Sequence, residues 1–352
     1  MAFRVIQYAT GTTGRLTLKT LFERPDMKLV GLGVTNPAKI GKDAGEIAGG
    51  KPTGVLATDD IDALCAMDAD VVLHMPLPSA LMRDGPRHDE DVICKFLASG
   101  KNVITTVGYV YPKAYGPDAV ARIEAACAKG KSSLHGTGFN PGFVSDVLPA
   151  TLLSMSARVD RVFIQDVSDF ALHPAASFVH DYLGFGTTPD QFAQRKAFAD
   201  YTNALFSESV MLLADSLGAR VDEIRPSLEY HLAIEDFQIA SGAIRKGTVS
   251  ATCGRWQAMV GGHLLIDVWL IYRARGDQGT QWGSDKPFVF RIEGRPNFNL
   301  QLEHDWISSG LWGSAGHAVN AIPHVVAAAP GIRTFLDLPM IRAHGAVRIG
   351  EV

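Results

Sequence analysis

A glycine-rich turn near the start of the chain has the residue types and spacing that hold a phosphate-bearing cofactor. It follows the apolar segment 3–8 and reads Ala9-Thr10-Gly11-Thr12-Thr13-Gly14. In such turns the second glycine lets the backbone approach a pyrophosphate, and the third lets the next helix pack closely on the sheet. Free N–H groups at the helix N-terminus favour the negative phosphates. The alternative is a tight turn of another α/β protein, but the placement directly after a first strand favours a nicotinamide dinucleotide.

The segment after the second predicted strand indicates which dinucleotide binds. It reads Val34-Thr35-Asn36-Pro37-Ala38-Lys39, and Lys42 follows shortly after. An acidic residue here would bind the 2′-hydroxyl of the adenosine ribose, and this segment has none. Thr35, Asn36 and Lys39 instead suit a 2′-phosphate, so we expect NADP(H) to be preferred. If the two lysines are only solvated loop charges, NAD(H) binds as well.

Hydride transfer also needs a proton donor near the acceptor, and the ends of the predicted strands offer several. Open α/β sheets bind ligands at the carboxyl ends of their strands. The strand ends offer Tyr109, Tyr111 and His74 as candidate acids. The alternative is aromatic packing for the tyrosines and a satisfied, partly buried ring for the histidine. Thr106 and Asn140 also follow predicted strands, and we expect them to border the cofactor.

Aromatic and histidine side chains in the second half of the chain predict a substrate pocket. His173 and His180 are seven residues apart, so they share one face if their segment is helical. The predicted pocket comprises Asn140, Phe170, His173, Ser177 and His180. Its composition suits an apolar or aromatic carbonyl or imine better than a small dicarboxylate. A core helix or a dimer-contact helix is the alternative for this segment.

Metal chemistry is not expected. His231 and Glu235 have the spacing of metal ligands on a helix, but their segment is strand-like. The four cysteines are scattered without a C-x-x-C pair, which argues against zinc and against a disulfide framework.

Composition excludes several other classes of function. The chain has 352 residues and a net charge of −4, and it has no basic stripe for a nucleic-acid partner. It contains no apolar run of about 18 residues that would span a membrane. The first residues run directly into a strand rather than into a signal segment. We therefore expect a cytoplasmic enzyme with reduced thiols and a small-molecule substrate.

The elements that position these residues follow two patterns. Up to about residue 150, short apolar strands alternate with amphipathic helices, which predicts a Rossmann-type, doubly wound parallel sheet. Its strands are expected at 3–8, 27–34, 70–74, 102–106 and 132–135. Strands then follow strands, which predicts an α+β domain with a mostly antiparallel sheet. Its strands are expected at 158–167, 227–233, 247–259, 263–272, 288–293 and 298–303.

Two helical regions complete the second half of the chain. A long helical region with a break is expected at 189–217. A glycine-rich loop at 308–311 then leads to a helix over 316–329 that Pro323 interrupts. The predicted domains are 1–150 for the dinucleotide, 151–312 for substrate and dimerisation, and a segment 313–352 that returns to the first domain.

Several blocks together resemble the dihydrodipicolinate reductase-like superfamily. They are Tyr8-Ala9-Thr10-Gly11 with Gly14, the loop 39–46, Gly136-Thr137-Gly138-Phe139-Asn140-Pro141-Gly142-Phe143, Gly184-Phe185-Gly186 and His317-Ala318-Val319-Asn320-Ala321-Ile322-Pro323. Within the superfamily, the chain resembles 2,4-diaminopentanoate dehydrogenases and native amine dehydrogenases. This resemblance implies a Rossmann domain and an α+β domain that covers the nicotinamide and forms a homodimer. It also implies NAD(P)H-dependent reduction of a C=N bond made from a ketone and ammonia. The resemblance further implies that the backbone of His74-Met75-Pro76 borders the nicotinamide ribose.

Two departures from the family pattern refine this expectation. The chain has no His-His pair, which true dihydrodipicolinate reductases carry in the second domain. Amine dehydrogenases carry a glutamate just after the fifth strand, and Gly108 falls at about that position here. Gly108 is therefore assigned to the substrate pocket. Tyr109 borders this position, so it is the first candidate for the acid, before Tyr111 and His74. We expect an NAD(P)H-dependent oxidoreductase that reduces a C=N or C=O bond of an apolar or aromatic small molecule. The alternative is an NADP(H)-binding sensor without chemistry.

Overall fold

The computed structural model describes residues 2–79, 87–283, 285–303 and 306–347. The chain divides into two units, which are described separately below. Unit 1 comprises Met1–Phe143 together with Gly310–Val352, and unit 2 comprises Val144–Ser309. In the described part of the chain, no helix combines the length and the apolar character needed to cross a membrane.

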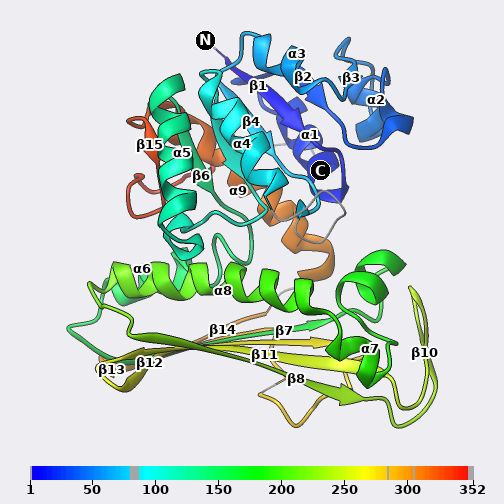
Figure 1. Ribbon diagram of the computed structural model, residues 1–352, viewed down its shortest axis with the longest axis vertical. Helices are drawn as coiled ribbons and strands as arrows, with labels where there is room; N and C mark the ends of the chain where they lie inside the picture. The colour runs from blue at the N-terminus through cyan, green and yellow to red at the C-terminus, as the bar shows by residue number, and fades with distance from the viewer. Residues whose placement is uncertain (1, 80–86, 284, 304–305, 348–352) are drawn as a thin grey trace. The chain divides into compact units, whose positions relative to one another are not determined.

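Unit 1 contains a seven-stranded sheet in the order β15-β6-β5-β4-β1-β2-β3 (Figure 1). Its pairings are parallel. The prediction of a doubly wound parallel sheet is therefore confirmed. The direction of winding reverses between β1 and β4, which is where open α/β sheets bind ligands. The strands are β1 (Phe3–Tyr8), β2 (Met27–Gly33), β3 (Ala57–Thr58), β4 (Val71–His74), β5 (Asn102–Thr105), β6 (Ser133–Gly136) and β15 (Gly331–Ile332).

Helices cover both faces of this sheet because its strands are apolar on both sides. Ile6 and Val72 pack with Phe96 on one face, whereas Val5 and Leu73 pack with Ile322 on the other. The helices of unit 1 are α1 (Thr12–Phe22), α2 (Ala44–Ala48), α3 (Ile61–Ala66), α4 (His88–Ala98), α5 (Pro117–Gly130) and α9 (Trp306–Ala327), which begins at the end of unit 2. Two 3₁₀ turns are η1 (Pro37–Lys39) and η3 (Pro112–Tyr115).

Helix α9 differs from the prediction in two ways. The predicted loop at 308–311 is part of the helix, and the helix continues through Pro323. Glycine here serves close packing rather than a turn, because a Cβ at Gly313 would lie 2.9 Å from the Phe139 ring. Proline removes one helical hydrogen bond. The buried side chains of Ile322 and Val325 hold both halves of the helix against the sheet.

Unit 2 contains a six-stranded sheet in the order β14-β13-β7-β12-β11-β8. The pairings β14–β13, β13–β7, β12–β11 and β11–β8 are antiparallel, whereas β7–β12 is parallel. This confirms the prediction of a mostly antiparallel sheet. The strands are β7 (Arg158–Asp169), β8 (Glu223–Leu232), β11 (Val249–Val260), β12 (His263–Arg273), β13 (Phe288–Arg295) and β14 (Phe298–Leu302). A separate hairpin, which the sequence did not indicate, consists of β9 (Phe237–Ile239) and β10 (Gly242–Ile244).

Helix α8 (Lys196–Ser216) lies along one face of the unit 2 sheet (Figure 1). Its Phe206 ring packs on the Trp256 ring of β11, with 4.8 Å between centroids. The predicted break in the helical region 189–217 separates α8 from α7 (Pro189–Ala193). Two shorter helical segments are α6 (Val147–Leu153) and the π-helical turn η4 (Ser177–Tyr182).

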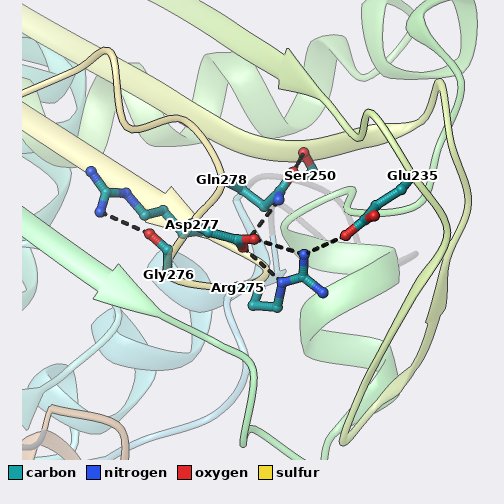
Figure 2. A network of polar contacts seen from close by, with 7 residues as sticks. Glu235, Ser250, Arg275, Gly276, Asp277 and Gln278 are labelled. Carbon is teal, nitrogen blue, oxygen red and sulfur yellow. Dashed lines mark hydrogen bonds and ion pairs between the residues drawn. The ribbon is translucent and has the colours of Figure 1, made fainter.

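The loop after β12 is fixed by a polar network rather than by regular structure. Arg275 donates to Asp277 at 2.7 Å and to Glu235 at 3.1 Å, and Ser250 Oγ donates to Gln278 at 2.9 Å (Figure 2). The same loop carries Trp282, which packs against Ala251, Cys253, Val167 and Ile271. These contacts give the network a structural role, because they hold the loop over its own sheet.

Candidate functional site

The glycine-rich turn has the geometry that its spacing predicts. Gly11 is the N-cap of α1 with φ −64°. Apart from Gly11 and its two chain neighbours, no heavy atom of the described residues lies within 4 Å of a Cβ built on it. Gly14 is the opposite case, because its Cβ would lie 2.2 Å from the carbonyl oxygen of Ala9. The turn therefore leaves open space at the second glycine and packs tightly at the third. This arrangement fits the pyrophosphate of a dinucleotide.

Ala9 stands where the glycine pattern has its first glycine, and its backbone has a conformation that favours glycine. Its φ is +72°, a left-handed conformation that costs a non-glycine residue about 1 kcal/mol. Gln7 Nε2 donates to the Ala9 carbonyl at 3.0 Å, which helps to hold this conformation. Ala9 therefore adopts a backbone conformation that glycine reaches without this cost.

A cluster of cations lies beside the turn. Lys39 Nζ donates to the Thr10 carbonyl at 2.7 Å and to Thr10 Oγ1 at 3.0 Å. Burial lowers the pKa of Lys39, and the nearby charges of Arg15 and Lys42 lower it further. Sequence reasoning missed Arg15, although its place in the first turn of α1 was a usable signal. Together these cations can hold an anionic group next to the pyrophosphate position.

Of the other residues predicted to bind the adenosine side, some already make hydrogen bonds within the protein. Asn36 Oδ1 accepts from the Ala38 N–H at 2.9 Å and so caps η1. Thr35 is exposed directly after β2 and Val34, and Thr12 and Thr13 occupy the first turn of α1. The structure thus brings the predicted adenosine-side residues to the carboxyl ends of β1 and β2.

His74 lies inside the sheet. Its side chain is 0% exposed, its Nδ1 lies 3.0 Å from Thr105 Oγ1, and its ring stacks on Tyr8. Burial lowers the pKa of His74 to about 3, so the ring is neutral near pH 7. The Nε2 atom lies 3.9 Å from Asp89 Oδ1, beyond hydrogen-bond distance. This placement favours a buried core histidine over a proton donor. The next residue, Met75, is buried with its Sδ 3.0 Å from Thr17 Oγ1.

The segment after β5 brings the two candidate tyrosines together. Tyr109 is 7% exposed, has φ +60° and stacks on Tyr115 with 5.0 Å between ring centroids. Tyr111 is 5% exposed, and the Lys113 ammonium lies 5.2 Å from its ring centroid. Gly108 precedes them with φ +106°, a conformation that favours glycine. Both rings are thus mostly enclosed by packing at the carboxyl end of β5.

His317 of α9, which was not among the predicted site residues, lies next to Thr137 at the end of β6. His317 Nδ1 lies 2.6 Å from Thr137 Oγ1, and the ring meets Phe143 edge-on with 5.3 Å between centroids. Burial, and secondarily His135, lowers the pKa of His317 to about 4. The sequence signal was only its place in the family-like block 317–323, because 180 residues separate it from Thr137. Asn140, predicted for both cofactor and pocket, follows β6 and is half-buried.

The predicted pocket residues of unit 2 do not form the expected helix face. Residues 173–175 are not helical, because Pro174 restricts the residue before it to an extended conformation. His173 packs on Phe178 with 5.0 Å between centroids, whereas His180 Nδ1 lies 2.9 Å from the Phe185 carbonyl oxygen. The shared face of His173 and His180 was expected only if their segment is helical, and this condition is not met at residues 173–175.

Aromatic rings surround this region of unit 2. Phe170 is buried against Phe185 and Tyr272, while Ser177 is exposed at the start of η4. The aromatic cluster consists of Phe170, His173, Phe178, Tyr182 and Phe198, each in ring contact with the next or with Phe178. In the part of the chain that the structure describes, no three or more His, Cys, Asp or Glu side chains gather as a metal site.

Comparison with known proteins identifies the family. Residues 143–348 match the 2,4-diaminopentanoate dehydrogenase C-terminal domain, and residues 5–84 match the dihydrodipicolinate reductase N-terminus. The chain belongs to the 2,4-diaminopentanoate dehydrogenase family. The resemblance seen in the sequence is thereby confirmed, and the protein is an oxidoreductase of the amine dehydrogenase and dihydrodipicolinate reductase-like type.

Individual relatives of this family member cover most of its length. An amine dehydrogenase of Streptomyces virginiae is 27% identical over 98% of both chains. A 2,4-diaminopentanoate dehydrogenase of Acetoanaerobium sticklandii is 28% identical over 71% of this chain and 70% of the relative. The solved structure of an amine dehydrogenase from Mycobacterium smegmatis has the same fold, with a TM-score of 0.79, 21% identity and 97% coverage of both chains.

Proposed function

We propose that this protein reduces a C=N or C=O bond of an apolar or aromatic small molecule with a nicotinamide dinucleotide. The observation that carries the proposal is the open space at Gly11 beside a tightly packed Gly14. A Cβ would fill that space, so the turn fits a backbone that approaches a pyrophosphate. When bound, the nicotinamide supplies the hydride, and the chain must orient the acceptor and supply the proton.

We propose NADP(H) as the preferred cofactor. Beside the turn, Arg15 and Lys42 are close enough to Lys39 for their charges to lower its pKa. The segment after β2 contains no carboxylate that would repel a 2′-phosphate. NAD(H) would share the pyrophosphate contacts but would gain nothing from these cations, and it remains the alternative.

The substrate class is proposed from the aromatic cluster of unit 2. Phe178 and Tyr182 stack with 5.0 Å between centroids, and Phe198 meets Tyr182 edge-on. Burial raises the pKa of Tyr182 far above its ordinary value, so its hydroxyl stays neutral. Such rings offer apolar area with few charges, which suits an apolar or aromatic group.

Whether ammonia is a co-substrate decides between two reactions of this class. The relatives named above are described as an amine dehydrogenase and a 2,4-diaminopentanoate dehydrogenase. Residues 105–112, after β5, contain no carboxylate. By the resemblance to amine dehydrogenases, Gly108 falls at about the position of their glutamate. This difference favours a ketone or a preformed imine as the substrate, and it also motivates the alternative of a cofactor-binding sensor.

Steady-state assays of the purified protein test the proposal. NADPH consumption is measured over a panel of aliphatic and aromatic ketones, with and without ammonia, and over preformed cyclic imines. Turnover without ammonia supports a ketone or imine reductase, and turnover only with ammonia supports an amine dehydrogenase. Tight NADPH binding without turnover on any member of the panel contradicts the proposal and supports the sensor.

We further propose a homodimer that forms on the face of the unit 2 sheet opposite α8. Arginine and aromatic side chains alternate across four strands of this face. Arg255 lies 3.8 Å from the Trp269 ring centroid, Trp269 meets Phe163 edge-on, and Arg291 lies 5.2 Å from the Phe163 centroid. Arginine and aromatic residues are enriched at protein interfaces, and a twofold axis lets one such face pair with itself.

Light scattering after size exclusion tests the homodimer. The wild-type protein is expected at the mass of two chains. Arg291→Glu is expected to shift the mass to that of one chain. Arg245→Glu, in the loop between β10 and β11, is expected to leave the mass unchanged. A wild-type mass of one chain contradicts the homodimer.

A further inference from the structure

The direction of α9 places His317 at the functional edge of unit 1. Ser133 Oγ, at the start of β6, donates to the carbonyl of Ala329 after the end of α9 at 2.9 Å. Thr137, directly after β6, contacts His317, which lies about ten residues before the end of α9. Helix and strand therefore run antiparallel, and His317 lies at the carboxyl end of β6.

This edge belongs to the nicotinamide half of the sheet. The turn that fits the pyrophosphate follows β1, and the cations beside it lie toward β2. The strands on the other side of β1 are β4, β5 and β6 in that order. Because a dinucleotide lies across the switch point of such a sheet, its nicotinamide is directed toward these strands. His317 and Thr137 are thus on the side where hydride transfer takes place.

The other titratable groups of this edge are engaged in packing. His74 is fully buried between Thr105 and Tyr8, and His135 Nδ1 lies 2.7 Å from the carbonyl of Arg333. Tyr109 and Tyr111 are almost fully buried. His317 differs from them because it is only partly buried. Its Nδ1 is paired with a hydroxyl group, as that of His74 is. A hydroxyl can both donate and accept, so this pair can move a proton.

We propose that His317 is the proton donor of the reduction and that Thr137 is its positioning residue. The inference rests on the proposed function, because a donor is needed only if a C=N or C=O bond is reduced. When the carbon of that bond gains a hydride, the π electrons move to the heteroatom. The heteroatom takes the proton from Nε2 of His317, Nδ1 takes the hydroxyl proton of Thr137, and the threonine oxygen takes a proton from water, which leaves as hydroxide.

A neutral imidazole suits this relay. With the Thr137 hydroxyl donating to Nδ1, the proton of the neutral ring is on Nε2, which is the nitrogen left to meet a substrate. Burial lowers the pKa of His317 to about 4, so this neutral form predominates near pH 7. The edge-on contact with Phe143 limits rotation of the ring and keeps Nε2 in one direction.

Histidine-selective ¹⁵N NMR tests the placement without any turnover. The His317 signals are assigned with His317→Gln, and saturating NADP⁺ is added to the wild-type protein. We expect the Nε2 resonance of His317 to shift while that of His324, two turns further along α9, does not. Thr137→Val is expected to change the tautomer balance of His317, whereas Thr137→Ser preserves it. Cofactor binding without a shift at His317 Nε2 overturns the proposal.

Kinetics of the same variants test the chemistry with a substrate found in the ketone and imine panel. His317→Gln is expected to lower kcat about 100-fold or more, since a general acid typically contributes that much. Thr137→Val should lower kcat about tenfold with little change in KM, Thr137→Ser should restore it, and His324→Gln should leave it unchanged. If His317→Gln retains wild-type kcat, another group is the donor and the proposal is wrong.

The outcomes separate this inference from the proposed function. Wild-type turnover with an unaffected His317→Gln variant refutes only the donor. Cofactor binding without wild-type turnover on any carbonyl or imine refutes the proposed function, and the donor role is lost with it. A shift at Nε2 together with loss of kcat in His317→Gln supports both.

Discussion

Replacing either glycine of the turn by alanine is expected to change a different property of the protein. Gly14→Ala should lower its stability, whereas Gly11→Ala should lower its affinity for NADPH. In Gly14→Ala the new Cβ lies 2.2 Å from the Ala9 carbonyl oxygen. This is more than 1 Å inside an ordinary contact of about 3.5 Å, so α1 must move away from β1. Such overpacking typically costs about 1–3 kcal/mol, and the better helix propensity of alanine offsets about 1 kcal/mol of it. We expect the free energy of unfolding to fall by about 1–2 kcal/mol.

Gly11→Ala has the opposite expected effect. Its φ of −64° suits alanine, and no described heavy atom lies within 4 Å of the new Cβ. Alanine is a poorer N-cap than glycine, which lowers stability by less than about 1 kcal/mol. The methyl group fills the space through which a pyrophosphate would approach the backbone. We expect the Kd for NADPH to rise at least about tenfold, which is about 1.4 kcal/mol.

Two measurements on each variant separate these effects. Urea unfolding gives the free energy of unfolding, and a fluorescence titration gives the Kd for NADPH. Gly11→Ala should fold normally and bind weakly, whereas Gly14→Ala should lose stability first. If Gly11→Ala binds NADPH within about twofold of the wild type, the turn is not the pyrophosphate site. If Gly14→Ala is as stable as the wild type, the tight contact between helix and strand does not limit this position.

Two further predictions concern charge. Lys39→Met should raise the Kd for NADPH about tenfold and leave the Kd for NADH within about threefold, because only NADPH carries the 2′-phosphate. The matched control is Lys19→Met, in the last turn of α1. Equal losses of affinity for both cofactors would contradict the assignment of Lys39 to the 2′-phosphate. The second prediction concerns the stability of the protein in acid. Burial lowers the pKa of His74 from its ordinary value of 6.5 to about 3, and it lowers the pKa values of His135 and His317 to about 4. Above pH 6.5 these rings are neutral in both the folded and the unfolded protein, but below it only the unfolded chain takes up their protons. Stability should therefore fall as the pH drops from 6.5 toward 4, at about 1.4 kcal/mol per pH unit for each histidine. Urea unfolding at pH 7 and pH 5.5 measures this slope, and equal free energies at the two pH values would show that these histidines are not buried as described.

The local features of this protein follow from its sequence. The turn after β1, the alternation of strands with helices and the change to successive strands after residue 150 each depend on neighbouring residues. Hydrophobic periodicity and turn chemistry act over a few residues, so they can be recognised without the fold. Gly11 and Gly14 received distinct roles from spacing alone, and the structure shows open space at one and close contact at the other.

Tertiary structure decided which distant residues meet. Thr137 and His317 are 180 residues apart and pair only because α9 runs antiparallel to β6. Arg15 joins Lys39 because β2 brings the loop after it back to the start of α1. The glycines of α9 suggested a loop, yet they allow Phe139 to pack against a continuous helix. Such pairings depend on strand order and on the direction of packing, and no pattern over a few residues encodes them.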